Sequence, residues 1–471
     1  MDLKLPMSFE ALDQDAKICL GVLSFVAAEN LPSKFLQVSS GTDLPEALAF
    51  TRDKNKLGGL IEQLTDTALI RQSEDRSTLS LHRLVQAEFL NQINHEDQQR
   101  LFENSIYLLR QVFPHRGQAR VNELEWPAGD IYWPHCLATI SKYRDSREEM
   151  EPLRPTLEFC KLLDDCSWYL FHNDIAGTVA MVIDVWFDAN AACKKTGQDP
   201  MVYANLLNIA GLNNMSIGEF ARSEAHFLEC KSIRSKHLAE NDEAMLNINS
   251  NIGLIYSCQN DSQRGVSFLM RALKILHSWD HRNLVKEVLV YTNLGKIYGA
   301  AGELDEAERY LHIALQVAIE LNSVYWTTAI YRALARTAVC MANISAADKY
   351  ARKMRDLLET PSGSRAGKLI QSKCKYAEGL VHHKAGRKTE AIEHLERADA
   401  MMTMHRLPIP LRARTTHLFS RACLLVDSRH EEGLRLKLKA RHLRQLLPGG
   451  KETIDEADDE AYDKFVDVIE R

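Results

Sequence analysis

The chain has 471 residues, a formal net charge of −6 and an isoelectric point near 6.3, and 45% of its residues are apolar and 26% charged. This composition is ordinary for a soluble protein of two or three domains, and it gives no overall attraction to nucleic acid or to an anionic membrane. No run approaches the roughly 20 apolar residues that a membrane-spanning helix needs, and the N-terminus lacks the apolar core of a signal peptide. The ten cysteines show no Cys-x-x-Cys spacing, so we expect neither a metal site nor a disulfide framework, and we predict a cytoplasmic protein.

Residues 7–95 are predicted to form a small domain of their own. Apolar residues at helical spacing predict a helix over 9–27. The elements expected after it are short helical segments at 31–36 and 44–50, a helix over 56–67, two short strands at 68–71 and 78–81, and a helix from residue 82. Helices followed by a two-stranded hairpin predict a winged-helix domain.

Winged helices also read DNA, through a helix that enters the major groove. The corresponding helix here carries Glu62 and Asp66 beside Lys54 and Lys56. It lacks the density of lysine and arginine that neutralising phosphates requires. We therefore expect this domain to pack against protein, and we expect no nucleic-acid partner.

Residues 96–165 are predicted to form a helical linker. Pro114 ends a helix over 97–112, and an aromatic, proline-rich segment at 126–136 precedes a further helix over 137–143. We expect the proline-rich segment to anchor the linker on the first repeat of the next domain.

The stretch 288–321 contains the pattern Tyr291-x2-Leu294-Gly295-x2-Tyr298, followed by Ala307-x3-Leu311-x2-Ala314. This is close to the tetratricopeptide pattern, in which two antiparallel helices form one unit of about 34 residues. The small residues are expected where the paired helices approach most closely, and Gly302 is expected in the turn between them. The stretch predicts one helical hairpin.

The same unit recurs through residues 166–447. The position of Ala307 returns as Ser223, Gly265, Ala347, Ala391 and Gly433, and that of Ala314 as Cys230, Ala272, Met354, Ala398 and Ala440. In both series the successive spacings are 42, 42, 40, 44 and 42 residues. This register predicts an all-α solenoid of six or seven hairpins, with a weaker copy around 168–189 at its start.

The first helices of such a solenoid line a concave groove, where we expect a protein or peptide partner to bind. The predicted partner-binding positions are Asn208, Asn247, Asn251, Asn293, Lys296, Arg332 and Arg336, with Asn205, Lys373 and Tyr376 beside them. Asparagine amides both donate and accept, which suits a peptide backbone, and lysine and arginine attract carboxylates. The alternative, left open by the sequence, is that the asparagines only connect adjacent helices of the solenoid.

The end of the chain combines a basic helix with an acidic tail. The basic helix, expected over 429–447, carries Arg435, Lys437, Lys439, Arg441 and Arg444. Because it continues the repeat register, it predicts a solvated face of the last hairpin. Residues 448–471 are predicted to form an acidic tail, either loose or capping the last apolar face.

The first domain ends in Leu81-His82-Arg83-Leu84-Val85-Gln86. It resembles the winged helix that follows the nucleotide-binding core of fungal STAND-type NTPases, the NB-ARC/tetratricopeptide relatives of NOD-like receptors. The resemblance implies that His82 stands in the family's Met-His-Asp motif, whose His approaches the β-phosphate of bound ADP, although Arg83 stands where many relatives have Asp. A His at a strand-to-helix junction can donate to a phosphate. The alternative is a His that caps the local turn.

No Gly-x-x-x-x-Gly-Lys-[Ser/Thr] motif occurs, so the phosphate-binding loop of that family is missing, and we expect either a shortened relative or a sequence that begins late. We expect no cofactor, no catalytic residues and no enzymatic activity. The leading hypothesis is a protein-interaction module, the ligand-sensing half of a STAND-type signal-transduction protein. The alternatives are a fragment of a regulatory ATPase, in which His82 contacts ADP, and a scaffold adaptor of the kinesin-light-chain kind. The sequence leaves self-association open.

Overall fold

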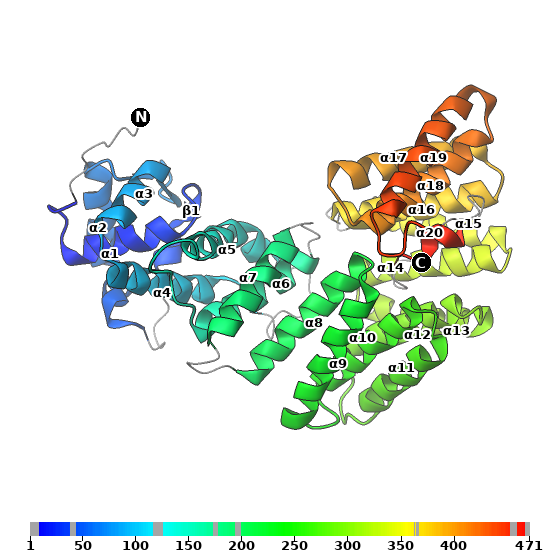
Figure 1. Cartoon of the computed structure of the whole chain (residues 1–471), viewed down its shortest axis with the longest axis horizontal. Helices are drawn as coiled ribbons and strands as arrows, with labels where there is room; N and C mark the ends of the chain where they lie inside the picture. The colour runs from blue at the N-terminus through cyan, green and yellow to red at the C-terminus, as the bar shows by residue number, and fades with distance from the viewer. Residues whose placement is uncertain are drawn as a thin grey trace. The chain divides into compact units, whose positions relative to one another are not determined.

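The computed structural model describes residues 9–37, 44–115, 126–172, 178–193, 199–361, 363, 367–452 and 459–466. The fold is all-α apart from one small sheet, as the sequence predicts (Figure 1). The described residues fall into two compact units, the first within 1–170 and 181–202 and the second within 171–180 and 203–471. The first unit holds the sheet, and the second holds the helical hairpins.

Helices occupy most of both units. The α-helices are α1 Gln14–Phe25, α2 Lys54–Asp66, α3 Arg83–Gln92, α4 His95–Val112, α5 Trp126–Ser146, α6 Leu157–His172, α7 Thr178–Cys193, α8 Pro200–Ser216, α9 Phe220–His237, α10 Glu243–Cys258, α11 Ser262–His277, α12 Leu284–Ala300, α13 Leu304–Glu320, α14 Val324–Cys340, α15 Ile344–Leu358, α16 Lys368–Lys384, α17 Lys388–Met404, α18 Ile409–Leu424, α19 His430–Gln445 and α20 Glu460–Asp463. Short 3-10 helices lie at η1 Ser33–Leu36, η2 Glu46–Arg52 and η4 Asp427–Arg429, and the strands are β1 Leu31–Pro32, β2 Ile70–Gln72 and β3 Thr78–Leu81.

The sheet is antiparallel, with β3 between β1 and β2. Ile70 of β2 lies opposite Leu81, which confirms the predicted hairpin, although its first strand begins two residues later and ends one residue later than predicted. The helical segment predicted at 31–36 is wrong at its start, because Leu31 pairs with Leu79 as a third strand. Proline has no N–H to donate and is restricted in φ, so Pro32 suits an edge strand better than a helix interior.

The segment Leu81–Gln86, at the end of the first domain's sequence motif, connects the sheet to α1. Leu81 and Val85 are buried in the core. The Gln86 side chain donates through Nε2 to the backbone carbonyls of Leu23 and Val26, both at 3.0 Å. Carbonyls at the end of a helix have no intrahelical partner, so Gln86 satisfies two acceptors at the C-terminus of α1.

The predicted linker is an integral part of the first unit. The predicted helix over 97–112 is confirmed as α4. The proline-rich segment, expected to precede a helix, is instead the beginning of the continuous helix α5, which contains Pro134. Pro127 lies in the first turn, where a missing N–H costs no intrahelical bond. The hydroxyl of Thr139 donates to the carbonyl of Phe25 at 3.0 Å, so α5 packs on the end of α1.

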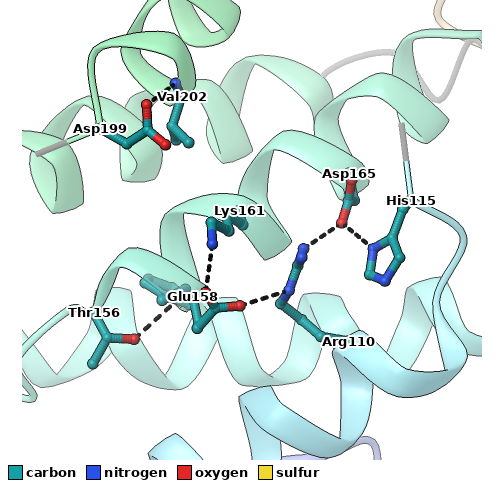
Figure 2. A network of polar contacts seen from close by, with 9 residues as sticks. Arg110, His115, Thr156, Glu158, Lys161, Asp165, Asp199 and Val202 are labelled. Atoms are coloured by element: carbon teal, nitrogen blue, oxygen red, sulfur yellow. Dashed lines mark hydrogen bonds and ion pairs between the residues drawn. The ribbon is translucent and has the colours of Figure 1, made fainter. Parts of the chain in front are cut away.

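A network of charged side chains joins α4 to α6 (Figure 2). Arg110 places Nη1 2.6 Å from Asp165 Oδ2 and Nε 3.0 Å from Glu158 Oε2. His115 Nδ1 lies 2.9 Å from the same Asp165 oxygen, and Lys161 Nζ lies 2.7 Å from Glu158 Oε1. The Asp165 side chain is only 7% exposed, and the basic side chains beside it compensate for its burial. We therefore assign the network a structural role.

The second unit contains six antiparallel hairpins: α8/α9, α10/α11, α12/α13, α14/α15, α16/α17 and α18/α19. The weaker copy predicted around 168–189 corresponds to α6 and α7, which belong largely to the first unit. Every residue of the two small-residue series is buried. Ser223 Oγ donates to the carbonyl of Gly211 at 2.7 Å, and a Cβ on Gly265 would lie 2.8 Å from the carbonyl oxygen of Gly253. The prediction that these positions mark the close approach of paired helices is confirmed.

Five of the six hairpin turns contain a residue in the left-handed conformation, whereas the turn between α18 and α19 contains the 3-10 helix η4. Gly218, Gly302 and Gly386 have φ values of +85°, +81° and +73°. In the turns of the alternate hairpins α10/α11 and α14/α15, the corresponding residues are Asn260, with a φ of +66°, and Ala342, with a φ of +56°. Glycine marks this left-handed conformation in a sequence, but asparagine does so weakly and alanine not at all. The sequence therefore shows only every second turn.

Candidate functional site

The first helices of the hairpins form one continuous surface. Each of α10, α12, α14 and α16 contacts the first helix of the following hairpin. In a curved stack of hairpins, the helices on the inner side lie closest to one another. We call the surface formed by the first helices α8, α10, α12, α14, α16 and α18 the inner face.

The predicted asparagines on the inner face mostly hold hairpins together. Asn251 Nδ2 donates to Asn208 Oδ1 at 2.9 Å, and Asn293 Nδ2 donates to Ser250 Oγ at 2.9 Å. Only 3% of Asn208 and of Asn293 is exposed. The structure thus gives these amides the connecting role that the sequence left as an alternative, and Asn208 and Asn293 are not exposed to a partner.

Two further asparagines accept hydrogen bonds from cations. Lys286 Nζ donates to Asn247 Oδ1 at 3.1 Å and lies 2.9 Å from Glu243 Oε1. Arg234 Nη2 donates to Asn205 Oδ1 at 3.0 Å. Asn247 and Asn205 are therefore linked to side chains of their own unit.

The predicted cations lie along α12, α14 and α16. Lys296, Arg332, Arg336 and Lys373 are all half-buried. Arg336 Nη2 donates to Asp463 Oδ2 at 3.3 Å. The carboxylate that Arg336 is expected to attract is thus supplied, in this structure, by the end of the same chain.

Sequence reasoning missed further cations on the inner face. Arg414, His417 and Arg421 are spaced three and four residues apart, which places them on one face of α18. Arg414 and His417 are buried, while Lys384 at the end of α16 is exposed. The spacing within α18 is a signal that the sequence contains, but it gains meaning only beside α14 and α16.

These cations surround the C-terminal segment, which we define as Asp459–Val466 and which includes α20 (Figure 1). Arg421 Nη1 lies 2.6 Å from Asp459 Oδ1, His417 Nε2 lies 3.3 Å from the same oxygen, and Lys384 Nζ lies 3.4 Å from Oδ2. Burial by itself would raise the pKa of Asp459, but His417 and Arg421 outweigh it and hold the pKa well below its ordinary value. Asp459 is therefore a carboxylate at neutral pH.

The ring of Tyr376, on α16, packs against one of these cations, Arg414. Its ring lies 4.2 Å below the guanidinium carbon of Arg414, and burial raises the pKa of its phenol to about 12. Arg414 Nη1 in turn lies 3.6 Å from Asp463 Oδ1. A cation held over an aromatic ring is restricted in orientation, so Arg414 is preorganised for a carboxylate.

The prediction that the basic helix forms a solvated face is wrong for Arg444. Arg444 is 2% exposed and does not lie on a solvated face. Its Nη1 donates to the carbonyls of Gly450 at 2.6 Å and Glu452 at 2.9 Å, and its Nε donates to that of Ala461 at 3.3 Å. Arg444 therefore anchors the chain that leads into the C-terminal segment, which is packed and not loose.

His82 lies exposed at the N-terminus of α3. Its Nδ1 accepts a hydrogen bond from the backbone N–H of Leu84 at 3.2 Å. The side chain therefore caps the helix, which is the alternative to the phosphate-binding role. In the neutral ring this bond leaves the proton on Nε2, which is then a donor.

We expect His82→Ala to lower the free energy of unfolding by about 0.5–1 kcal/mol, because the variant loses an N-cap hydrogen bond. Asparagine is a strong N-cap residue, so His82→Asn should retain most of the stability. Urea denaturation of the three proteins measures both effects, with Arg83→Ala at the exposed neighbouring position as the control. An asparagine variant as unstable as the alanine variant would contradict the capping role.

Two family models match parts of the chain. Residues 7–98 match one described as a domain of unknown function, DUF7779, and residues 289–323 match a tetratricopeptide repeat. The second match confirms the repeat predicted from the stretch 288–321. No curated protein matches the chain.

Solved structures of repeat proteins resemble the chain at low identity. One is a STAND protein with a tetratricopeptide repeat sensor from Pyrococcus horikoshii, with a TM-score of 0.49 and 12% identity over 96% of this chain and 62% of that one. Another is a Rap protein complexed with Competence and Sporulation Factor, with a TM-score of 0.46 and 13% identity over 74% of this chain and 93% of that one. The apo form of the quorum sensor NprR from B. thuringiensis has a TM-score of 0.40 and 11% identity, over 60% of this chain and 75% of that one. Similarities this remote carry no information about what the present chain binds.

Among the residues that the structure describes, no helix is both long and apolar enough to cross a bilayer.

Proposed function

We propose that the second unit is a protein-binding module whose inner face receives a carboxylate-bearing segment of a partner. Stacked helical hairpins expose an extended concave surface suited to such a segment. The observation that carries the proposal is the convergence of cations from three hairpins: Arg336 on α14, Lys384 on α16, and Arg414 with Arg421 on α18. Together these four cations contact two carboxylates, Asp459 and Asp463, which supports the binding of acidic side chains here.

Lys296 and Arg332 extend this basic surface toward the earlier hairpins, on α12 and α14. Asn247 and Asn251, which are half-buried, border it on α10. We propose that the cations bind the partner's carboxylates and that these two asparagines contribute at the edge. The buried Asn208 and Asn293 position their neighbours.

We further propose that the chain acts as the sensor half of a STAND-type signalling protein and is not an enzyme. The resemblance of residues 7–95 to a winged helix supports this role, together with the order of a small domain, helices 96–165, repeats 166–447 and an acidic end at 448–471. His82 is the proposed contact to a nucleotide core, since its Nε2 is the ring nitrogen left to donate to a phosphate. The absence of a phosphate-binding loop from the sequence supports a non-enzymatic role for the chain itself.

The proposal is tested with peptides on the full chain. Octapeptides carrying two aspartates at varied spacing, each paired with its asparagine counterpart, are titrated against the wild type and against Asp459→Lys/Asp463→Lys, which reverses the two charges now on the inner face. We expect diaspartate peptides to bind at least one of the two proteins. Arg332→Glu/Arg336→Glu should weaken this binding by about 10-fold or more.

The matched control is Lys349→Glu/Arg352→Glu, which makes the same change in net charge at exposed positions of the second helix α15. It should leave peptide binding within about 2-fold of the parent protein, because rim and remote charges contribute little to affinity. Equal losses in the two charge-reversal variants, or no difference between aspartate and asparagine peptides, would reject the inner face as the binding surface.

A further inference from the structure

The C-terminal segment presents two carboxylates to the inner face from one side of a helical turn. Asp459 and Asp463 are four residues apart, so they project in the same direction. Asp459 contacts Lys384 and Arg421, on α16 and α18, and Asp463 contacts Arg336 on α14. A segment of eight residues thus connects the first helices of three successive hairpins.

Apolar contacts accompany these charges. The Tyr462 ring is stacked on the His417 ring, with centroids 4.0 Å apart and planes inclined by 13°. Val466 is 1% exposed and packs with a cluster of apolar side chains, Leu369, Met402, Leu407 and Leu411. The segment therefore occupies the surface with both carboxylates and buried side chains, as a bound peptide would.

The segment does more than cover the end of the solenoid. A cap would contact the last hairpin alone, but Asp463 reaches α14, two hairpins earlier. The carbonyl oxygen of Phe465 lies 3.3 Å from the position of a Cβ on Gly218, in the turn of the first hairpin. The segment therefore contacts earlier hairpins in addition to the last one, where Ala461 and Tyr462 pack with Ala440 and Leu443 of α19.

Two of the ion pairs of the segment are partly exposed, whereas Arg414 and His417 are buried beneath it. The side chains of Asp459 and Arg421 are 31% and 33% exposed, and those of Asp463 and Arg336 are 23% and 31% exposed. Partly exposed ion pairs contribute little net stability because water and salt screen them. The segment is thus held by ion pairs together with the buried side chains of Tyr462 and Val466, and a competing segment must supply both kinds of contact to replace it.

We propose that the C-terminal segment is an intramolecular occupant of the partner site, and that the partner carries a similar acidic and aromatic sequence, which displaces it. This sequence is Asp-x-x-Tyr-Asp followed, after one further residue, by two apolar residues. This proposal rests on the proposed function of the inner face and specifies its ligand. Phosphate groups would also attract the cations, but the stacked Tyr462 and the buried Val466 favour a protein segment over nucleic acid.

Attachment to the same chain gives the segment an advantage over a free partner. A short tether raises the effective concentration of a ligand to about the millimolar range. The apparent affinity of the partner is reduced by the fraction of molecules in which the site is already occupied. The segment therefore sets a threshold, and a partner binds only when its own contacts exceed those of Asp459–Val466.

The test uses a fluorescent peptide of residues 455–471 and three full-length proteins. These are the wild type, Asp459→Lys/Asp463→Lys, and the control Asp356→Lys/Glu431→Lys, which makes the same charge change at exposed positions on α15 and α19. Fluorescence anisotropy gives the Kd of the peptide, and a scrambled peptide of identical composition reports non-specific charge attraction. We expect the double variant to bind the peptide at least about 10-fold more tightly than the wild type or the control. The scrambled peptide should bind all three proteins equally weakly.

Hydrogen exchange on the wild type provides a second measurement that does not depend on a variant folding. The amides of 459–466 should exchange slowly, and an excess of the unlabelled peptide should accelerate them. Equal peptide affinity for all three proteins, or exchange in the segment that the peptide leaves unchanged, would overturn the proposal and leave the segment as a structural cap. If the diaspartate octapeptides bind while the 455–471 peptide does not, this inference falls and the proposed function stands. If neither binds, both fall.

Discussion

Gly265→Val is expected to lower the free energy of unfolding of the repeat array by more than about 3 kcal/mol. A Cβ on Gly265 would lie 2.8 Å from the carbonyl oxygen of Gly253, and a Cβ on Gly253 would lie 2.9 Å from that of Gly265. Both contacts are with backbone, which cannot rotate away as a side chain can. The two helices α10 and α11 must therefore separate, and separation removes the packing around buried Leu269 and Ala272. Urea denaturation followed by circular dichroism measures the loss.

The matched control is Gly299→Ala, in α12 of the next hairpin. Its Cβ would meet the Ala307 Cβ at 3.7 Å and the Thr337 hydroxyl at 3.9 Å, which are ordinary contacts. Alanine restricts the unfolded chain more than glycine does, so this variant should be unchanged or more stable by up to about 1 kcal/mol. Similar losses for both variants would show that the spacing of small residues does not reflect the approach of paired helices.

Glu378→Ala is expected to lower the free energy of unfolding by about 1.5–3 kcal/mol, because it removes a buried carboxylate that is paired with three partly exposed basic side chains. Glu378 is 1% exposed on α16. It pairs with Arg355 on α15, with Lys375 Nζ at 2.8 Å, and with His394 Nδ1 at 3.3 Å on α17. This carboxylate therefore joins two adjacent hairpins. The control Glu393→Ala removes an exposed carboxylate paired with Arg397 at 2.8 Å, and it should change stability by less than about 0.5 kcal/mol.

The pKa of Glu378 predicts how the free energy of unfolding depends on pH. Burial would raise the pKa of Glu378, but hydrogen bonds from His394, Lys375 and Arg355 outweigh it and hold the pKa at about 2, against an ordinary value of 4.5. Because the folded-state pKa is the lower one, the stabilisation is complete above pH 4.5 and is lost as the pH falls toward 2. The shift corresponds to about 3 kcal/mol. Glu378→Gln should remove this part of the acid dependence, and a variant whose stability falls with acid as steeply as the wild type would contradict the assignment.

The repeat architecture could be predicted because its constraint is local and periodic. Paired helices approach closely only where side chains are small, so Ser223, Gly265 and Ala307 recur at one spacing. Only every second turn could be recognised from the sequence, by its glycine. Ala342 adopts the same left-handed conformation as Gly302, but its identity does not indicate it, because there the surrounding hairpin imposes the backbone conformation.

Other features could not be predicted because they depend on contacts between distant residues. Leu31 is a strand residue only because Leu79 lies beside it. Pro127 and Pro134 suggest an interruption, yet α5 is continuous and packs on α1 through Thr139. A proline-rich segment has a weak local preference, which packing overrides.

By itself, the sequence determined the hairpins, their register and the cations Lys296, Arg332 and Arg336 on the first helices, since helical periodicity alone assigns a residue to a face. Tertiary structure decided which asparagines are buried, that His82 caps a helix, and that Arg336 meets a carboxylate 127 residues away. The physical reason is that an ion pair or an interhelical hydrogen bond requires two side chains at about 3 Å, and only the folded array brings residues that are distant in the sequence to that separation.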